Sequence, residues 1–121
     1  MANVLIIDDD ETVLETFQIV LSSSGHPVQT ASNGALGIEA TKTNSFDIVV
    51  TDVVMPEKDG LEVLMQMRKT HPDTKIVVVS GGGRTSATDY LKMAEVLGAD
   101  RVLYKPVTAT EVSAAIEELS S

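Results

Sequence analysis

Five short runs of apolar, mostly β-branched residues recur along this chain, and turn-forming or charged residues follow each of them. The runs cover residues 3–7, 27–31, 46–51, 75–79 and 101–104. Short runs of this kind, closed by polar residues, indicate strands. Most of them lack polar alternation, which is typical of strands covered on both faces, so they favour a parallel sheet.

Segments with helical spacing lie between and after these runs. Their amphipathic positions are Val13, Leu14, Phe17, Val20 and Leu21, then Leu36, Ile38 and Ala40 within residues 34–43, Leu61, Leu64, Met65 and Arg68, then Leu91, Ala94 and Leu97, and finally Val112, Ala115, Ile116 and Leu119. Gly25 and Gly98 stand where glycines that end helices belong. Alternating strands and helices with right-handed crossovers predict an α/β fold. We expect a doubly wound, five-stranded parallel sheet of order 2-1-3-4-5 with helices on both faces, a flavodoxin-like arrangement.

Composition narrows the class of protein. The 121 residues predict a single domain over 1–121, and the absence of cysteine excludes thiol nucleophiles and zinc–cysteine or iron–sulfur sites. Eighteen Asp and Glu against nine Lys and Arg disfavour nucleic-acid and anionic-membrane partners. No cationic segment precedes the first apolar run, as a signal peptide requires. We therefore expect a soluble cytoplasmic protein.

Polar residues at the strand ends predict where a site forms. They are Asp8, Asp9 and Asp10 after the first run, Asp52 after the third, Ser80 after the fourth and Lys105 after the fifth. In the predicted order, the carboxyl ends of strands 1 and 3 meet at the topological switch point, where such sheets bind ligands. Asp8 and Asp9 then lie one strand from Asp52, and Lys105 lies two strands away, roughly 10 Å by strand spacing.

This grouping indicates phosphoryl chemistry with a divalent cation. Carboxylates held so closely repel one another unless a cation shares the site, and oxygen ligands with room for water suit Mg²⁺. Asp52 is then a candidate nucleophile toward phosphorus, with Lys105 and Ser80 neutralising the phosphoryl oxygens. Each residue also has an ordinary structural interpretation, since acidic residues cap helices and polar residues fill loops. Polar groups at the ends of four strands, all at one edge of the sheet, favour the joint site.

The chain resembles the receiver domains of bacterial response regulators over residues 3–119. The matching pieces are Val4-Leu5-Ile6-Ile7-Asp8-Asp9-Asp10, Asp47-Ile48-Val49-Val50-Thr51-Asp52-Val53-Val54-Met55-Pro56, Asp59-Gly60, Val78-Val79-Ser80-Gly81, Gly98-Ala99-Asp100 and Lys105-Pro106. The resemblance implies a receiver domain of two-component signalling, and we expect either a stand-alone receiver or one excised from a longer protein. It also implies the strand order given above, so the two are not independent.

By this resemblance, Asp52 receives a phosphoryl group from a histidine kinase or a histidine phosphotransfer protein. Asp8, Asp9, Asp52 and the backbone carbonyl of Val54 hold Mg²⁺, or Mn²⁺. The protein is then no enzyme beyond catalysing its own phosphorylation and dephosphorylation. Val54 and Gly82 occupy positions that flank the phosphoryl group in the family. Because neither can position a water through a polar side chain, we expect a long-lived aspartyl phosphate.

The resemblance also implies a switch. Ser80, Gly81 and Lys105 contact the phosphoryl group, and the bond between Lys105 and Pro106 is a cis peptide, which costs little before proline. Phosphorylation changes the face formed by the fourth helix, the fifth strand and the fifth helix, and a downstream protein binds there. The identity of that protein does not follow from the resemblance.

Three features depart from the family pattern. The usual switch aromatic is replaced by Val102, although Tyr104 lies on the same face of the strand. Residues 81–89 form a longer, glycine-rich segment, which indicates either a tolerated insertion or a specialised loop. Val107 stands where the family often has Phe, with no mechanism attached.

Two other functions fit parts of the sequence. Residues 8–12 match the D-x-D-x-T loop of haloacid-dehalogenase-like phosphatases, in which Asp8 would be the nucleophile and Asp10 the general acid. An Asp52→Asn variant separates that function from a receiver, since only the phosphatase would still be labelled, on Asp8. A flavin-binding module on the same fold is the other alternative, and a colourless protein would argue against it.

Overall fold

The computed structural model describes residues 2–52, 60–80, 92, 95, 98–105 and 107–120. Its strands are β1 (Val4–Ile7), β2 (Val28–Ala31), β3 (Ile48–Asp52), β4 (Lys75–Ser80) and β5 (Arg101–Tyr104), and its helices are α1 (Glu11–Ser23), α2 (Gly34–Thr43), α3 (Gly60–Thr70) and α5 (Ala109–Ser120). The strands in this part of the chain form one parallel sheet in the order β2-β1-β3-β4-β5, which confirms the predicted order. The predicted helix with Leu91, Ala94 and Leu97 lies outside the described residues, as do residues 81–89.

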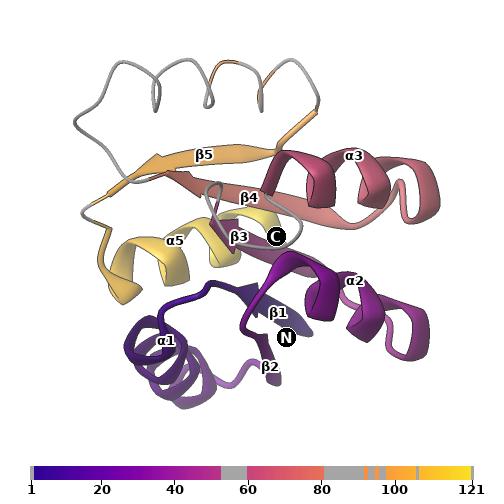
Figure 1. Cartoon of the computed structure of the whole chain (residues 1–121). Coiled ribbons are helices and arrows are strands. Elements are labelled where there is room, and N and C mark those ends of the chain that lie inside the picture. The colour runs from indigo at the N-terminus through magenta and orange to yellow at the C-terminus, as the bar shows by residue number, and fades with distance from the viewer. Residues whose placement is uncertain are drawn as a thin grey trace.

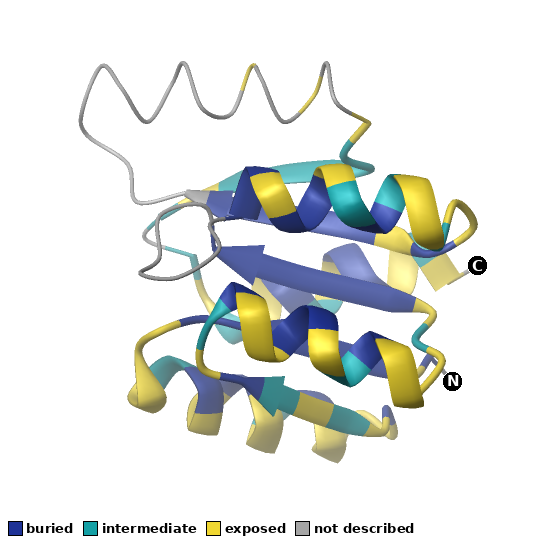
Figure 2. Ribbon diagram, turned by 45° about the vertical axis from the view of Figure 1, so that its right-hand side comes forward, coloured by how far each residue is buried: buried dark blue, intermediate teal, exposed yellow. Residues whose placement is uncertain are grey.

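Two hydrophobic cores lie on opposite faces of the sheet, and strand alternation divides the residues between them. Ile7 packs in one core with Leu64 of α3, whereas Ile6 packs in the other with Phe17 of α1 and Ile116 of α5. Thus α2 and α3 cover one face and α1 and α5 cover the other (Figure 1). Every residue of β1 and β3 is buried (Figure 2). This explains why these two sequences are continuously apolar until the site begins.

Strand ends differ slightly from their predicted bounds. β1 and β2 begin one residue later than predicted, and β3 begins two residues later, at Ile48. The backbone N–H of Val4 still donates to the carbonyl of Pro27 at 2.9 Å. β3 and β4 each extend one residue further, to Asp52 and Ser80. The ladder between β3 and β4 includes Asp52, paired with Val79. The sheet itself therefore fixes the backbone of this carboxylate.

Local contacts determine where the helices next to the site begin and end and how closely they pack on the sheet. Asp10 is the N-cap of α1 and accepts hydrogen bonds from the backbone N–H groups of Thr12 and Val13. Gly25 follows the C-cap of α1 with a φ of 92°, as a terminating glycine does. Gly37 lets α2 approach β1, because a Cβ built there would lie 2.3 Å from Cδ1 of Ile7. Among the helices that the structure describes, none is long and apolar enough to cross a membrane.

Candidate functional site

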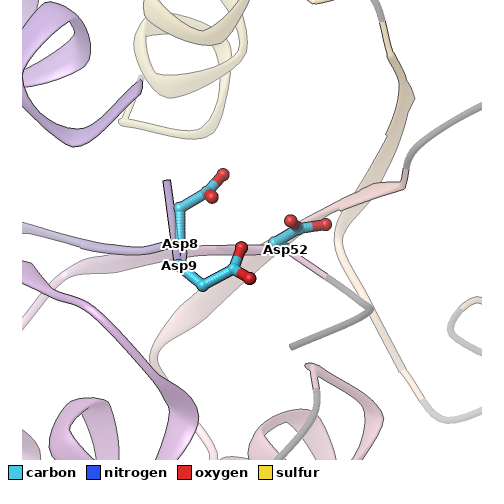
Figure 3. A group of neighbouring side chains, drawn as sticks. All are labelled: Asp8, Asp9 and Asp52. Atoms are coloured by element: carbon cyan, nitrogen blue, oxygen red, sulfur yellow. The ribbon is translucent and has the colours of Figure 1, made fainter. Parts of the chain in front are cut away.

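Three carboxylates gather where β1 and β3 end side by side. Asp8 and Asp9 follow β1, and Asp52 is the last residue of β3. The register pairs Ile7 with Thr51, so the residues that follow meet at the same edge. One carboxylate oxygen from each aspartate lies within 4.8 Å of those from the other two (Figure 3). The predicted convergence of these residues is therefore present in the structure.

Burial distinguishes the three aspartates. Asp8 is 5 % exposed and Asp52 is 6 % exposed, whereas Asp9 is exposed to solvent. The backbone N–H of Asp8 donates to the carbonyl of Ala31 at 3.1 Å, which ties its position to the end of β2. Two carboxylates are thus held rigidly below the surface while the third faces water. This all-oxygen set, open to water on one side, fits a hard divalent cation such as Mg²⁺.

Lys105 reaches the carboxylates from two strands away. Its Nζ donates to Oδ2 of Asp52 at 3.0 Å and lies 3.7 Å from Oδ2 of Asp8. The long side chain spans the distance predicted from the strand spacing. A single ammonium therefore lies among three carboxylates. Counting formal charges, the cluster carries a net charge of −2 when all four groups are ionised.

Burial and neighbouring charges shift the ionisation of this cluster. Burial raises the pKa of Asp8 above its ordinary value, and the charges of Asp52 and Asp9 raise it further. The N–H of Asp10, which donates to Asp8, and the Lys105 ammonium oppose that rise. For Lys105, burial by itself lowers the pKa, but the hydrogen bond to Asp52 and the surrounding carboxylates outweigh burial and raise the pKa. The ammonium of Lys105 is therefore retained, and it neutralises only part of the negative charge of the three carboxylates.

The structure shows which residues of the acidic run at 8–10 cap a helix and which belong to the carboxylate site. Asp10 is occupied as the cap of α1, with Oδ1 2.9 Å from the N–H of Thr12. This is the ordinary structural interpretation of an acidic run, and it applies to this residue. Asp8 instead lies beside Asp52 and Lys105. The general-acid role that the phosphatase alternative gives to Asp10 would compete with its role as a cap.

Several predicted site residues lie outside the described part of the chain. They are Val54, Gly81 and Pro106, together with the side chain of Ser80. The backbone of Ser80 ends β4 at the same edge of the sheet, and its register partner is Tyr104. Tyr104 is 54 % exposed, whereas Val102 is partly buried against the core beneath α2 and α3. An exposed aromatic side chain therefore stands beside the end of β4.

A cavity beside the carboxylates, lined by apolar and charged residues, was not predicted from the sequence. It has a volume of about 260 Å³ and is lined by Ile6, Ile7, Asp8, Asp10, Val13, Phe17, Val50, Asp52, Val79, Lys105 and Val107. The substitution of valine for the family's aromatic at position 107 was the only sequence signal for it. Val107 packs only partly buried against the core beneath α1 and α5.

Comparisons with known proteins agree with the geometry. The sequence profile of the response regulator receiver domain matches residues 4–117. The chain is 36 % identical over 116 residues to the response regulator MprA of Mycobacterium sp. (strain KMS), covering 96 % of this chain and 49 % of that protein. It is 34 % identical to the transcriptional regulatory protein QseB of Haemophilus influenzae, covering 96 % and 51 %. The chain therefore spans about half the length of these two relatives.

A solved structure shows the same likeness in three dimensions. The response regulator receiver domain protein from Clostridium thermocellum superposes with a TM-score of 0.88 at 34 % identity, covering 98 % of this chain and 94 % of that one. The likeness covers the sheet at whose carboxyl edge this chain has its aspartate cluster. The comparisons give no support to the phosphatase alternative.

Proposed function

The chain belongs to the family of response regulator receiver domains, and from that premise we propose that Asp52 is its phosphoacceptor. The observation that carries the proposal is the ion pair of 3.0 Å between Asp52 and Lys105, with Asp8 and Asp9 beside it. Asp8 and Asp9 lie with Asp52 around one point, and Lys105 is the cation placed to meet a phosphoryl group. Lys105 pairs with two members of this group, and its shorter contact is the one to Asp52.

The transfer step places charge where this cluster can neutralise it. A carboxylate oxygen of Asp52 attacks the phosphorus of a phosphohistidine on a partner protein and forms a P–O bond. The P–N bond breaks, and the histidine nitrogen keeps its electron pair. Lys105 then donates to a phosphoryl oxygen in place of Oδ2 of Asp52, which it contacts before transfer. Asp8 and Asp9, with Asp52 and the carbonyl of Val54, would hold Mg²⁺, which supplies positive charge to the phosphoryl oxygens when bound.

The segment between β5 and α5 can transmit a movement of Lys105 to the surface of α5. Lys105 directly follows β5, and α5 begins four residues later in the chain, at Ala109. Thr108 and Glu111 form a reciprocal capping box, in which the backbone N–H of each residue donates to the side chain of the other. A displacement of Lys105 toward a phosphoryl group would thus pull on a rigid helix start. We propose that the switched face is formed by the fourth helix, β5 and α5, where Val102 holds the usual position of the aromatic and Tyr104 lies nearby on the same strand.

The donor and the target are proteins in this proposal. A histidine kinase or a histidine phosphotransfer protein supplies the phosphoryl group, and a protein binds the switched face. Ser80 and Gly81 would contact the phosphoryl group beside Lys105. The protein would act as a receiver that catalyses only its own phosphorylation and dephosphorylation.

Phosphate labelling tests the proposal. The purified protein is incubated with Mg²⁺ and a small-molecule phosphodonor such as phosphoramidate, and intact mass and peptide mapping locate the phosphoryl group. We expect label on Asp52, no label in Asp52→Asn, and full label in the control Asp73→Asn, an exposed aspartate before β4. Label that persists in Asp52→Asn, or that maps to Asp8, would refute the assignment.

A further inference from the structure

We propose that the cavity beneath the carboxylates is a binding site for a small aromatic amine, with the ring in the cavity and the ammonium among the aspartates. The cavity and the charge of the cluster together carry this inference. It concerns a second ligand of the same sheet edge, and it does not require that Asp52 accept a phosphoryl group.

The shape and lining of the cavity suit one aromatic ring. Ile6, Val50 and Val79 form its floor from β1, β3 and β4, and all three belong to the core beneath α1 and α5. Val13 and Phe17 of α1 also line it, and Val107 lines it from the segment before α5. Apolar cavities of about 150 Å³ are known to bind benzene. A volume of about 260 Å³ therefore holds a ring with a short polar arm.

A short side chain at position 107 leaves this space open. Val107 is only partly buried, and so is Val13. Both have branched side chains that end close to the backbone, so the space between them is bounded by methyl groups. Both side chains keep part of their surface outside the core, and a planar hydrocarbon group placed against them would cover that surface favourably.

Charge selects the polar end of the ligand. Asp8, Asp10 and Asp52 line the cavity at the carboxyl edge of the sheet, and among the described residues of its lining Lys105 is the one cation. The nearby Asp9 adds another carboxylate. In the metal-free protein, an ammonium is attracted by this excess of negative charge, whereas a carboxylate is repelled. Because a divalent cation uses the same carboxylates, the amine and Mg²⁺ should exclude each other.

Three probes of the same ring size separate the contribution of the apolar lining from that of the negative charge. Benzylamine, benzyl alcohol and benzoate are titrated into the ¹⁵N- and methyl-labelled protein in metal-free buffer and followed by NMR. We expect saturable benzylamine shifts centred on Val13, Phe17, Val50 and Val79. Benzyl alcohol should bind more weakly, and benzoate weaker than benzylamine by about tenfold or more, as the reversed charge requires. Saturating Mg²⁺ should weaken benzylamine by at least several-fold.

A variant that fills the cavity, paired with a control variant elsewhere, tests whether the ring binds there. Val107→Phe replaces the isopropyl group by a benzyl group, so it should reduce benzylamine affinity by about tenfold or more. Val102→Phe makes the same change in a partly buried residue against the opposite core, and it should leave the affinity unchanged. Both variants are checked by Mg²⁺ titration, since a folded site retains metal binding in either one.

The results decide the proposal in either direction. No benzylamine shifts in the wild-type protein, equal binding of all three probes, or shifts centred away from the cavity would overturn it. Unchanged affinity in a folded Val107→Phe protein would overturn it too. Because the titrations use no phosphodonor, their failure leaves the labelling of Asp52 untouched, and a failure of labelling leaves the titrations untouched.

Discussion

Removing the ammonium of Lys105 tests how the carboxylates of the site are held together. Its Nζ lies 3.0 Å from Asp52 and 3.7 Å from Asp8. At an effective dielectric constant of about 20, these distances correspond to attractions of about 5.5 and about 4.5 kcal/mol. Desolvation offsets most of both, and breaking a fully buried pair costs about 3–5 kcal/mol. Because the Lys105 side chain is 31 % exposed, we expect Lys105→Met to lower the free energy of unfolding by about 2 kcal/mol.

The two distances also predict coupling between Lys105 and Asp52. Slightly more than half of the attraction comes from Asp52, so Lys105→Met should cost only about 1 kcal/mol in an Asp52→Asn background. Urea unfolding of the four proteins, followed by circular dichroism in metal-free buffer, measures this cycle. Lys69→Met, on the exposed last turn of α3, is the control and should change stability by less than about 0.5 kcal/mol. An equal loss in both backgrounds would show that the lysine does not act through Asp52.

Three further predictions concern the pH dependence, the helix packing and the phosphoryl lifetime. The pKa of Asp8 is higher in the folded protein than the ordinary value of 3.8, so the folded state binds the proton more tightly. The contribution of Asp8 to the free energy of unfolding therefore falls as the pH rises from 3.8 through the folded pKa. The stability of Asp8→Asn relative to wild type should therefore increase over that interval in urea titrations, and a decrease would contradict the raised pKa. Gly37→Ala should lose about 1–3 kcal/mol through the clash with Ile7, and Ile7→Val should recover part of that loss in calorimetry; a neutral Gly37→Ala would refute the close packing. If Val54 and Gly82 position no water, phosphorylated protein freed of its donor should keep its label for minutes, and decay within seconds would argue against this.

The fold could be predicted because its signals are local. Continuously apolar strands such as Val4–Ile7 occur where both faces of a sheet are covered, and the structure buries all of that strand. Residues 34–43, with the least regular apolar pattern, nevertheless form α2 over the predicted range. The cap by Asn33 and the close approach of Gly37 to β1 compensate for the weak amphipathic pattern. Strand starts were less predictable, because backbone pairing decides them and the composition changes only gradually there.

The main residues of the site were predictable because strand ends converge by topology. Asp8, Asp9, Asp52 and Lys105 meet as their positions in the order predict. Residue type and spacing alone could not separate Asp10 from its neighbours; only the family resemblance assigned the metal to Asp8 and Asp9 and left Asp10 out. Cavities depend on how side chains from several elements fail to fill a space, so the one beside Val107 could not be derived from any single segment.

The central claim is that Asp52 accepts the phosphoryl group within a cluster formed with Asp8, Asp9 and Lys105. Amide NMR spectra with Mg²⁺ and beryllofluoride, a phosphoryl mimic that binds a carboxylate, test it most directly. The account predicts large shifts at the ends of β1 and β3 and at Lys105, extending into β5 and the start of α5, and their loss in Asp52→Asn. The same shifts in Asp52→Asn, or no response of the wild-type protein, would contradict it.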